Sequence, residues 1–464
     1  MPSVSPLRKL VRSGSLLILG LGGIAAAVVV SRPGLSLPSS VGGSITDSPK
    51  EVIDQVWQIV YRDYLDSSGA YTESRWRHLR GELLRKSYAD SDASYEAIRG
   101  MLASLNDPYT RFLDPKEFKE MQIDTTGELM GVGIQLGLDK ETKELVVISP
   151  IDGTPASRAG VQSKDVIITI DGASTEGMST SDAVKLIRGP EGSEVVLGLR
   201  RDGRVLNVPL IRARIELNAV KSSLNTAQDG SKVGYIRLKT FNANASREMR
   251  EAIRELEEQE ADGYVLDLRS NPGGLLEASV DIARQWLNEG TIVSTRTREG
   301  IRDVRRATGS ALTDKPVVVL INEGSASASE ILSGALQENG RAELVGMKTF
   351  GKGLVQAVRG LADGSGMTVT IAKYLTPRGT DIHQNGIKPD LEADLTEKEI
   401  KGLTPDDLGT AKDGQYKVAE SALVKALTKA DAGQTYSPTG ANLQSAIQMP
   451  KQYLLAAKNF DSDE

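Results

Sequence analysis

Short apolar runs alternate with stretches of helical spacing through the second half of the chain. Residues 263–269 and 316–322 are rich in β-branched and other apolar side chains, which is typical of buried strands. Each run is followed by a stretch of helical spacing, at 275–287 after the first and 330–336 after the second. Repeated strand and helix units of this kind predict an α/β core, which we place at residues 214–392.

A different pattern precedes this core. Apolar residues between Val52 and Val60 share one helical face, and helical spacing continues to about Leu105. Before them, residues 33–45 are rich in Pro, Gly and Ser, as linkers often are. We therefore expect a linker and a helical N-terminal domain at residues 35–127, parts of which complete the core.

Residues 128–213 predict a small sheet with one helix. Strand-like runs at 144–148 and 165–172 are followed by helical spacing over 179–187. With the Gly-Val-Gly-Ile stretch before them, this order resembles a PDZ domain, which binds a peptide C-terminus by adding it as a strand to a sheet edge. The resemblance makes four residues the carboxylate-binding loop, namely Gly131, Val132, Gly133 and Ile134.

The N-terminus has the pattern of a targeting segment. Arg8, Lys9 and Arg12 precede an uncharged, mostly apolar stretch at 16–30. This stretch is shorter than the roughly 20 residues of a membrane span and suits the h-region of a signal peptide. We assign residues 1–34 to a signal peptide or a retained signal anchor, which would give membrane association through residues 16–30. Both predict a protein that works outside the cytoplasm.

Composition excludes several classes of function. The 464 residues carry a net charge of −6 without a basic stripe or interleaved aromatics, which argues against nucleic-acid binding. There is no cysteine, and only two histidines, His78 and His383, so we expect no metal and no cofactor. The remaining residues, 393–464, predict a partly disordered extension, in which an amphipathic helix at 415–429 would cover a partner surface.

The candidate chemistry lies at the strand-to-helix turns of the core. Ser327 stands between the run at 316–322 and the following helix, and Lys352 lies 25 residues later between two glycines. A serine hydroxyl needs an adjacent base before it can attack a carbonyl, and a neutral lysine is a known alternative to histidine. Burial or a nearby positive charge would lower the lysine pKa enough for this role.

Ser327, Lys352 and the two glycines that follow the run at 263–269, Gly273 and Gly274, also have purely structural interpretations. Ser327 and Glu330 have the spacing of a capping box, although a helix N-terminus also offers N–H groups to an oxyanion. Gly273 and Gly274 fit a tight turn as well as a close approach to a ligand. A lysine taken alone is most often a solvated surface residue, although the glycines that flank Lys352 put it in a loop that can turn inward.

Taken together, the motifs resemble the carboxyl-terminal-processing (tail-specific) serine proteases of peptidase family S41. The resemblance runs from about residue 50 to about residue 390 and looks closest to cyanobacterial members. It is carried by the following stretches: Asn106–Leu113, Asp267–Gly274, Gly324–Glu330, Thr349–Gln356 and His383–Asp390.

The resemblance implies a role for each site residue. Ser327 would be the nucleophile, Lys352 the general base and Gln356 the residue that orients the lysine. Glu330 would support the pair. The oxyanion would accept hydrogen bonds from the N–H of Ala328 and from the N–H of one glycine, either Gly273 or Gly274. His383 and His78 lie outside the motifs and are expected to be structural or surface residues. The implied fold class is an α/β multidomain protein. It would have a spiral (crotonase/ClpP-like) protease core, an inserted PDZ domain and a helical N-terminal domain.

Two functions follow from these patterns. The first is an exported serine endopeptidase of the periplasm or thylakoid lumen, which recognises free, apolar C-terminal tails of protein substrates and cleaves near them. We also expect PDZ engagement to move Lys352 into register. The second is a non-catalytic PDZ protein that binds tails on a protease-like scaffold. Ser327, Lys352 and Gln356 are all present, which favours the enzyme, and the sequence identifies no adaptor.

Overall fold

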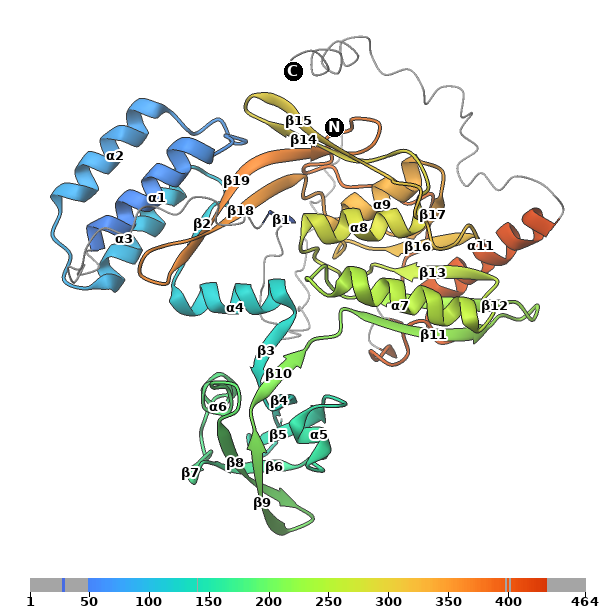
Figure 1. Ribbon diagram of the computed structural model, residues 1–464, viewed down its shortest axis with the longest axis horizontal. Coiled ribbons are helices and arrows are strands. Elements are labelled where there is room, and N and C mark those ends of the chain that lie inside the picture. The colour runs from blue at the N-terminus through green and yellow to red at the C-terminus, as the bar shows by residue number, and fades with distance from the viewer. Residues whose placement is uncertain (1–26, 30–48, 140, 397–398, 400–401, 432–464) are drawn as a thin grey trace, which may run out of the picture.

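The computed structural model describes residues 27–29, 49–139, 141–396, 399 and 402–431 (Figure 1). Three helices form its N-terminal region: α1 (Pro49–Asp63), α2 (Glu73–Arg85) and α3 (Ser91–Ala103). The predicted apolar face of α1 is buried, and two indoles join α1 to α2. Trp57 Nε1 donates to the Trp76 carbonyl at 2.8 Å, and Trp76 Nε1 returns a bond of 3.2 Å to the Trp57 carbonyl. The predicted helical N-terminal region is confirmed.

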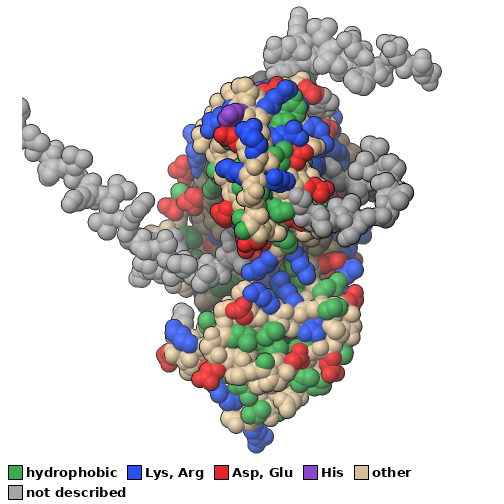
Figure 2. Space-filling view, turned by 90° about the vertical axis from the view of Figure 1, so that its left-hand side faces the viewer, with side chains coloured by type: hydrophobic (Ala, Val, Ile, Leu, Met, Phe, Trp, Pro, Cys, Tyr) green, Lys and Arg blue, Asp and Glu red, His purple; other side chains and the backbone are tan. Residues whose placement is uncertain are grey.

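A narrow ribbon leads from these helices to a separate sheet unit. Helix α4 (Pro115–Thr126) is followed by β3 (Glu128–Gly131), which pairs antiparallel with β10 (Ala213–Glu216). The chain between them folds into the unit drawn below the rest of the molecule in Figure 1. The same unit is the lower lobe in Figure 2, under a narrower waist.

The separate unit has its own sheet and its own apolar core. The strand order is β4-β5-β6-β8-β9, with β7 paired to β6, so β4 lies at an edge. Buried Val147, Ile167 and Leu197 belong to the core of this unit. Its elements are β4 (Ile134–Leu138), β5 (Leu145–Pro150), α5 (Pro155–Arg158), β6 (Val166–Ile170), β7 (Ala173–Ser174), α6 (Thr180–Ile187), β8 (Glu194–Arg201) and β9 (Arg204–Ile211).

The main sheet is covered by helices on both faces. Its order is β11-β12-β13-β16-β17-β20, and all pairs except β11–β12 are parallel. Helices α7, α8 and α9 cover one face and α11 the other (Figure 1). The elements are β11 (Val220–Thr226), β12 (Lys232–Leu238), α7 (Ala245–Glu258), β13 (Gly263–Asp267), α8 (Leu276–Trp286), β16 (Val317–Ile321), α9 (Ala328–Glu338), β17 (Ala342–Gly346), β20 (Leu391–Glu392) and α11 (Gly414–Asp431).

Full burial of β13 and β16 explains their continuous apolar sequences. Val318 and Leu320 point into the core beneath α11, while Val317 and Val319 point into the core beneath α7 to α9. The predicted amphipathic helix at 415–429 exists as part of α11. The predicted partner surface was wrong, because α11 packs its apolar side chains on the chain's own sheet.

A second sheet lies beside the first and supports the N-terminal helices. Its order is β1-β18-β19-β14-β15, with β2 paired to β19. Met367 and Val369 of β19 are buried against α1 and α3. The strands are β1 (Ala27–Val29), β2 (Arg111–Leu113), β14 (Thr291–Thr297), β15 (Gly300–Arg306), β18 (Leu354–Gly360) and β19 (Gly366–Leu375).

The carboxyl ends of β13, β16 and β17 meet at one edge of the main sheet, because these neighbours run parallel. Such an edge is where open α/β sheets form their sites. The fold class predicted from the sequence, an α/β core with an inserted sheet unit and N-terminal helices, is the one observed. Outside β1, the predicted signal segment lies beyond the described residues. Among those that are described, no helix is both long and apolar enough to cross a membrane.

Candidate active site

Three loops that follow neighbouring strands of the main sheet bring the candidate residues together. The loop after β13 holds Gly273 and Gly274, the loop after β16 ends at Ser327, and the loop after β17 carries Lys352. Hydrogen bonds tie the first two loops to each other. The Ala326 N–H and the Ser329 hydroxyl both donate to the Asn271 carbonyl, at 3.0 and 2.8 Å. The sequence predicted these turns, and parallel pairing places them side by side.

Ser327 is held in a strained turn at the start of α9. Its φ of 56° and ψ of −111° are rarely adopted by residues other than glycine. The side chain is fully buried, and its Oγ has no hydrogen-bond partner in the described part of the chain. The Glu330 N–H donates to the Ser327 main-chain carbonyl at 2.8 Å. The hydroxyl is therefore not used as a helix cap and is available for chemistry.

Glu330 connects the serine loop to the lysine loop. Its Oε2 accepts the N–H of Ser327 and the N–H of Lys352, each at 2.8 Å. Its Oε1 accepts the Gly351 N–H at 2.7 Å and the Thr349 hydroxyl at 2.6 Å. Burial raises the pKa of the carboxyl, although these hydrogen bonds oppose the shift. The carboxylate thus sets the spacing of the two loops.

Lys352 has the environment of a general base. Its side chain is 2% exposed, and Nζ lies 4.6 Å from the centre of the Tyr109 ring. Burial and, to a smaller extent, the positive charge of Arg111 lower the pKa of Lys352 to about 7, although the negative charges of Asp107 and Glu330 oppose the shift. A large part of the amine is neutral at physiological pH, as proton abstraction requires.

Gln356 lies close to these groups in β18. Its Nε2 donates to the Thr370 hydroxyl at 3.4 Å, and its buried Oε1 has no hydrogen-bond partner in the described part of the chain. A bulge between Val355 and Gln356 interrupts the pairing with β19 at this point. In this conformation Gln356 makes no hydrogen bond to Lys352.

The candidate oxyanion donors surround Ser327. A Cβ built on Gly273 would lie 2.9 Å from the Ser327 Cβ and 3.0 Å from the Ala328 nitrogen, so only glycine fits there. The Gly273 N–H donates to Asn271 Oδ1 at 2.9 Å. Ala328 is the first residue of α9, where an amide has no acceptor within the helix. Ala328 therefore offers one candidate amide to an oxyanion beside Ser327, and Gly274, or Gly273 once it is released from Asn271, offers the second.

The predicted peptide-binding loop lies far along the chain from this site and borders the edge strand β4. Val132 is buried, and its carbonyl accepts the Ala156 N–H at 2.9 Å. Gly133 has a φ of +79°, and its carbonyl accepts the Ile151 N–H at 2.9 Å. Ile134 begins β4 opposite Pro150 of β5. Hydrogen bonds from Ala156 and Ile151 thus hold the loop in place. The loop continues into β4, an edge strand to which an extended peptide can add.

Several groups around Lys352 were not singled out from the sequence. Tyr109, Asp107 and Arg111 come from the segment before α4, and the Tyr374 hydroxyl donates to the Ser327 carbonyl at 3.1 Å. The stretch Asn106–Leu113 was noted only as family-like, and nothing in the sequence marks Tyr374. A cavity of about 340 Å³ lies beside them, lined by Ser67, Ser68, Asn106, Asp107, Pro108, Tyr109, Phe350, Gly351, Leu354, His383 and Gln384.

The two histidines occupy the kinds of place that were expected. His78 lies on the exposed face of α2, with Nε2 3.4 Å from Glu82. His383 lines the cavity, its ring centre 6.4 Å from that of Tyr109, and burial lowers its pKa. Among the described residues no group of three or more His, Cys, Asp or Glu side chains is arranged to hold a metal ion.

Comparison with known proteins agrees with this geometry. Residues 232–393 match the peptidase family S41, and residues 120–200 match the PDZ domain. A carboxyl-terminal-processing protease of Synechocystis sp. is 47% identical over 74% of this chain and 80% of its own length. Carboxyl-terminal-processing peptidase 2, chloroplastic, of Arabidopsis thaliana is 41% identical over 76% of this chain and 72% of its own length.

A solved structure agrees as well. The photosystem II D1 C-terminal processing protease superposes with a TM-score of 0.51 at 37% identity, covering 81% of this chain and 98% of that protein. The chain belongs to the carboxyl-terminal-processing proteases of peptidase family S41 and is a serine endopeptidase of that class.

Proposed function

We propose that Ser327 and Lys352 form the catalytic dyad of this peptidase. The observation that carries the proposal is the Glu330 carboxylate, which binds the main-chain N–H groups of both residues and so holds their loops together. The low pKa of the buried lysine supports the same assignment. Gln356 would orient the lysine once the dyad is engaged.

In the reaction, neutral Lys352 takes the Ser327 hydroxyl proton as Oγ attacks the scissile carbonyl carbon. The resulting oxyanion accepts hydrogen bonds from the N–H of Ala328 and from that of Gly273 or Gly274. When the tetrahedral intermediate collapses, the C–N bond breaks, and the lysine gives its proton to the leaving amine. A water molecule, deprotonated by Lys352, then attacks the acyl-enzyme ester. Its hydrolysis releases the new C-terminus and restores the serine.

The conformation described above supports a gated version of this dyad. Within the described residues the Ser327 Oγ makes no hydrogen bond, and the Lys352 amine lies over the Tyr109 ring. A rearrangement of the side chains or of either loop is then needed before proton transfer, and binding of a substrate tail to the PDZ domain is the proposed trigger.

The PDZ domain would select the substrate. The edge strand β4 offers its main chain to an extended peptide, and the loop from Gly131 to Ile134 lies where the peptide carboxylate would bind. We propose that residues 128–213 act as this module and that the preferred tails are apolar with a free carboxylate. Residues 35–127 and 214–392 would supply the helical domain and the catalytic core.

We further propose that the enzyme is exported. The support is the charged and apolar pattern of residues 1–34. Two relatives of this chain are cyanobacterial and four are named chloroplastic, which agrees with the periplasm or the thylakoid lumen. Residues 16–30 would provide membrane association if the signal segment is retained.

The deciding experiment is intact-mass analysis of a folded test protein that ends in an apolar tail with a free carboxylate. It is incubated with the full chain, with the Ser327→Ala variant and with the Lys352→Ala variant. We expect the parent alone to remove the tail. Cleavage by Ser327→Ala would contradict the dyad. Tail binding without cleavage by the parent would favour the non-catalytic PDZ protein.

A further inference from the structure

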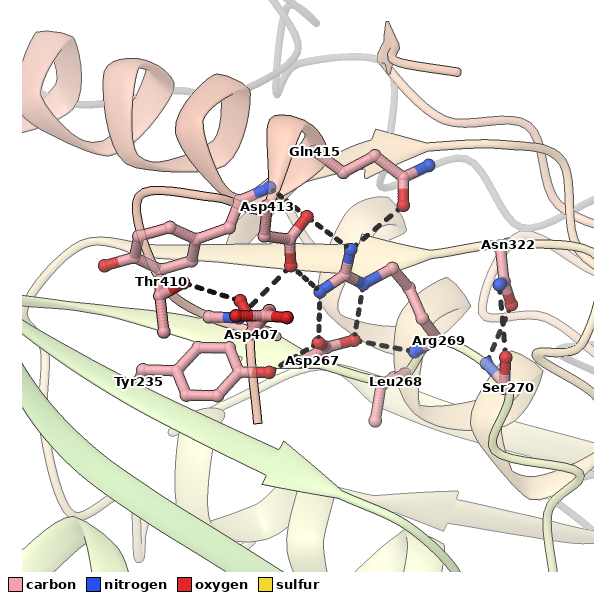
Figure 3. Close-up of polar contacts among 12 residues, drawn as sticks. Tyr235, Asp267, Leu268, Arg269, Ser270, Asn322, Asp407, Thr410, Asp413 and Gln415 are labelled. Atoms are coloured by element: carbon pink, nitrogen blue, oxygen red, sulfur yellow. Dashed lines mark hydrogen bonds and ion pairs between the residues drawn. The ribbon is translucent and has the colours of Figure 1, made fainter. Parts of the chain in front are cut away.

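A buried ionic cluster joins the start of helix α11 to the loop after β13 (Figure 3). The Arg269 guanidinium lies between two carboxylates. Nη2 donates to Asp267 Oδ2 and to Asp413 Oδ2, each at 2.6 Å. Nη1 donates to Asp413 Oδ1 and to Gln415 Oε1, each at 3.0 Å. Asp267 ends β13, whereas Asp413 immediately precedes α11 and Gln415 lies in its first turn.

The cluster is withdrawn from water. Asp267 and Asp413 are fully buried, and Arg269 is 5% exposed. Burial opposes the charge of Arg269, but the two carboxylates outweigh it and raise the arginine pKa. When a buried guanidinium loses one of its carboxylates, its positive charge is only partly compensated. Because an uncompensated buried charge is unfavourable, we expect the guanidinium to change position.

Asp413 is fixed from its own side. Its Oδ1 accepts the Tyr416 N–H and its Oδ2 the Gly409 N–H, each at 3.1 Å. The helix behind it is anchored by buried Tyr416, Ala419 and Leu423, which pack on β13 and β16. Asp413 is therefore a rigid partner for the arginine.

Arg269 is one residue away from the loop that borders the nucleophile. Ser270 follows with a φ of 56°, and its N–H donates to Asn322 Oδ1 at 2.8 Å. Next in the chain, the Asn271 carbonyl accepts from the serine loop, and Gly273 approaches Ser327 closely. Because this segment is short, a change in the position of Arg269 would also displace the main-chain N–H groups of Gly273 and Gly274.

We propose that Asp413 is a positioning residue of the active site, acting through Arg269 on the oxyanion loop from Ser270 to Gly274. The inference rests on the proposed function, because it takes Ser327 as the nucleophile beside that loop. In this proposal the segment that contains α11 contributes to catalysis, because it holds the oxyanion loop in position from the face of the main sheet opposite α8 and α9.

The test compares the full chain with its Asp413→Asn and Asp407→Asn variants. Asp407 lies in the same segment and also loses a charge, but it bonds Thr404 and Lys412 and has no contact with Arg269. We expect Asp413→Asn to lower kcat for a tailed substrate about tenfold or more, because a displaced oxyanion donor loses part of the roughly 100- to 1000-fold that its complete removal costs. KM and the midpoint of the pH profile should not change, and Asp407→Asn should stay within about twofold of the parent.

A merely structural role predicts a different result. A folded Asp413→Asn enzyme with kcat within about twofold of the parent would overturn the proposal. If Asp413→Asn does not fold, Asp413→Glu decides. It keeps the charge but displaces the arginine by one methylene, so a folded form should again lose kcat alone. Failure of both variants to fold would make Asp413 a folding residue and also refute the proposal. The Ser327→Ala variant in the same assay distinguishes failure of this proposal from failure of the proposed dyad, since cleavage by Ser327→Ala would refute the dyad.

Discussion

Glu330 and Lys352 are joined directly, because Oε2 of the glutamate accepts the main-chain N–H of the lysine at 2.8 Å. The same oxygen accepts the N–H of Ser327, so a single buried carboxylate bonds the proposed nucleophile and the proposed base. The sequence indicated only a capping box, in which Glu330 bonds the start of its own helix. In the structure the same carboxylate also bonds the loop that carries Lys352, so it connects two loops of the site.

Replacing this carboxylate should disable the enzyme. In Glu330→Gln, the amide NH₂ would face main-chain N–H donors and cannot accept from them. We expect the free energy of unfolding to fall by about 2 kcal/mol or more, since buried donors lose their acceptor. We also expect kcat to drop about 100-fold, because small displacements of catalytic groups have effects of this size. Chemical denaturation and steady-state kinetics measure the two effects.

Glu338→Gln is the matched control. Glu338 lies in the same helix and accepts the Arg378 N–H at 2.7 Å, away from both loops of the dyad. This variant should keep kcat close to that of the parent. Equal losses of activity in the two variants would show that helix α9, rather than the bridging carboxylate, is what the reaction needs.

The pH profile of the peptidase should follow the ionisation of Lys352. The lysine acts as a base only when neutral, and its pKa is lowered to about 7. Activity should therefore fall about tenfold for each pH unit well below 7 and level off above about 8. The measurement is kcat/KM for a tailed substrate from pH 5 to 10. A profile that keeps rising to pH 10 would mean that the lysine is solvated and ionises normally.

Conservation of charge at position 352 should not preserve activity. Arginine stays protonated in proteins, so Lys352→Arg cannot take the serine proton. We expect cleavage to fall to the level of Ser327→Ala, while tail binding, measured by fluorescence anisotropy, stays as in the parent. Lys348→Arg, an exposed change in the same loop, is the control and should be silent. Near-normal turnover by Lys352→Arg would remove lysine from the role of base.

Much of the core was predictable because its signals are local. Continuous β-branched runs marked β13 and β16, and the glycines and serines after them marked the turns where Ser327 and Gly273 lie. Parallel pairing then places such turns together, so the site could be assembled from the sequence. The position of Ser327 at a helix start was likewise visible in the apolar spacing that follows it.

The surroundings of the dyad were harder to predict because they depend on distant pairings. Tyr109 reaches Lys352 only because β2 pairs with β19, a contact between segments about 250 residues apart. Helix α11 was recognised by its apolar face, but spacing alone does not say which surface that face covers. Asp413 has no local signal at all, since its partner Arg269 lies 144 residues away.

The PDZ loop gives a prediction about substrate selection. Gly133 has a φ of +79°, and a Cβ there would lie 2.3 Å from the Thr154 side chain. Gly133→Ala should therefore push the Gly131–Ile134 loop away from its support and raise KM for a tailed protein about tenfold. Cleavage of a short peptide without a matching tail should change little. Isothermal titration with a tail peptide would measure the lost affinity directly.

The control for this last effect is Gly153→Ala. Gly153 has nearly the same backbone angle, φ +72°, yet its Cβ would meet nothing within 4 Å. Both variants carry the same backbone strain, and only Gly133→Ala adds the clash beneath the loop. A loss of tail affinity confined to Gly133→Ala would place the peptide carboxylate at this loop. Equal behaviour of the two variants would mean that substrates reach Ser327 without it.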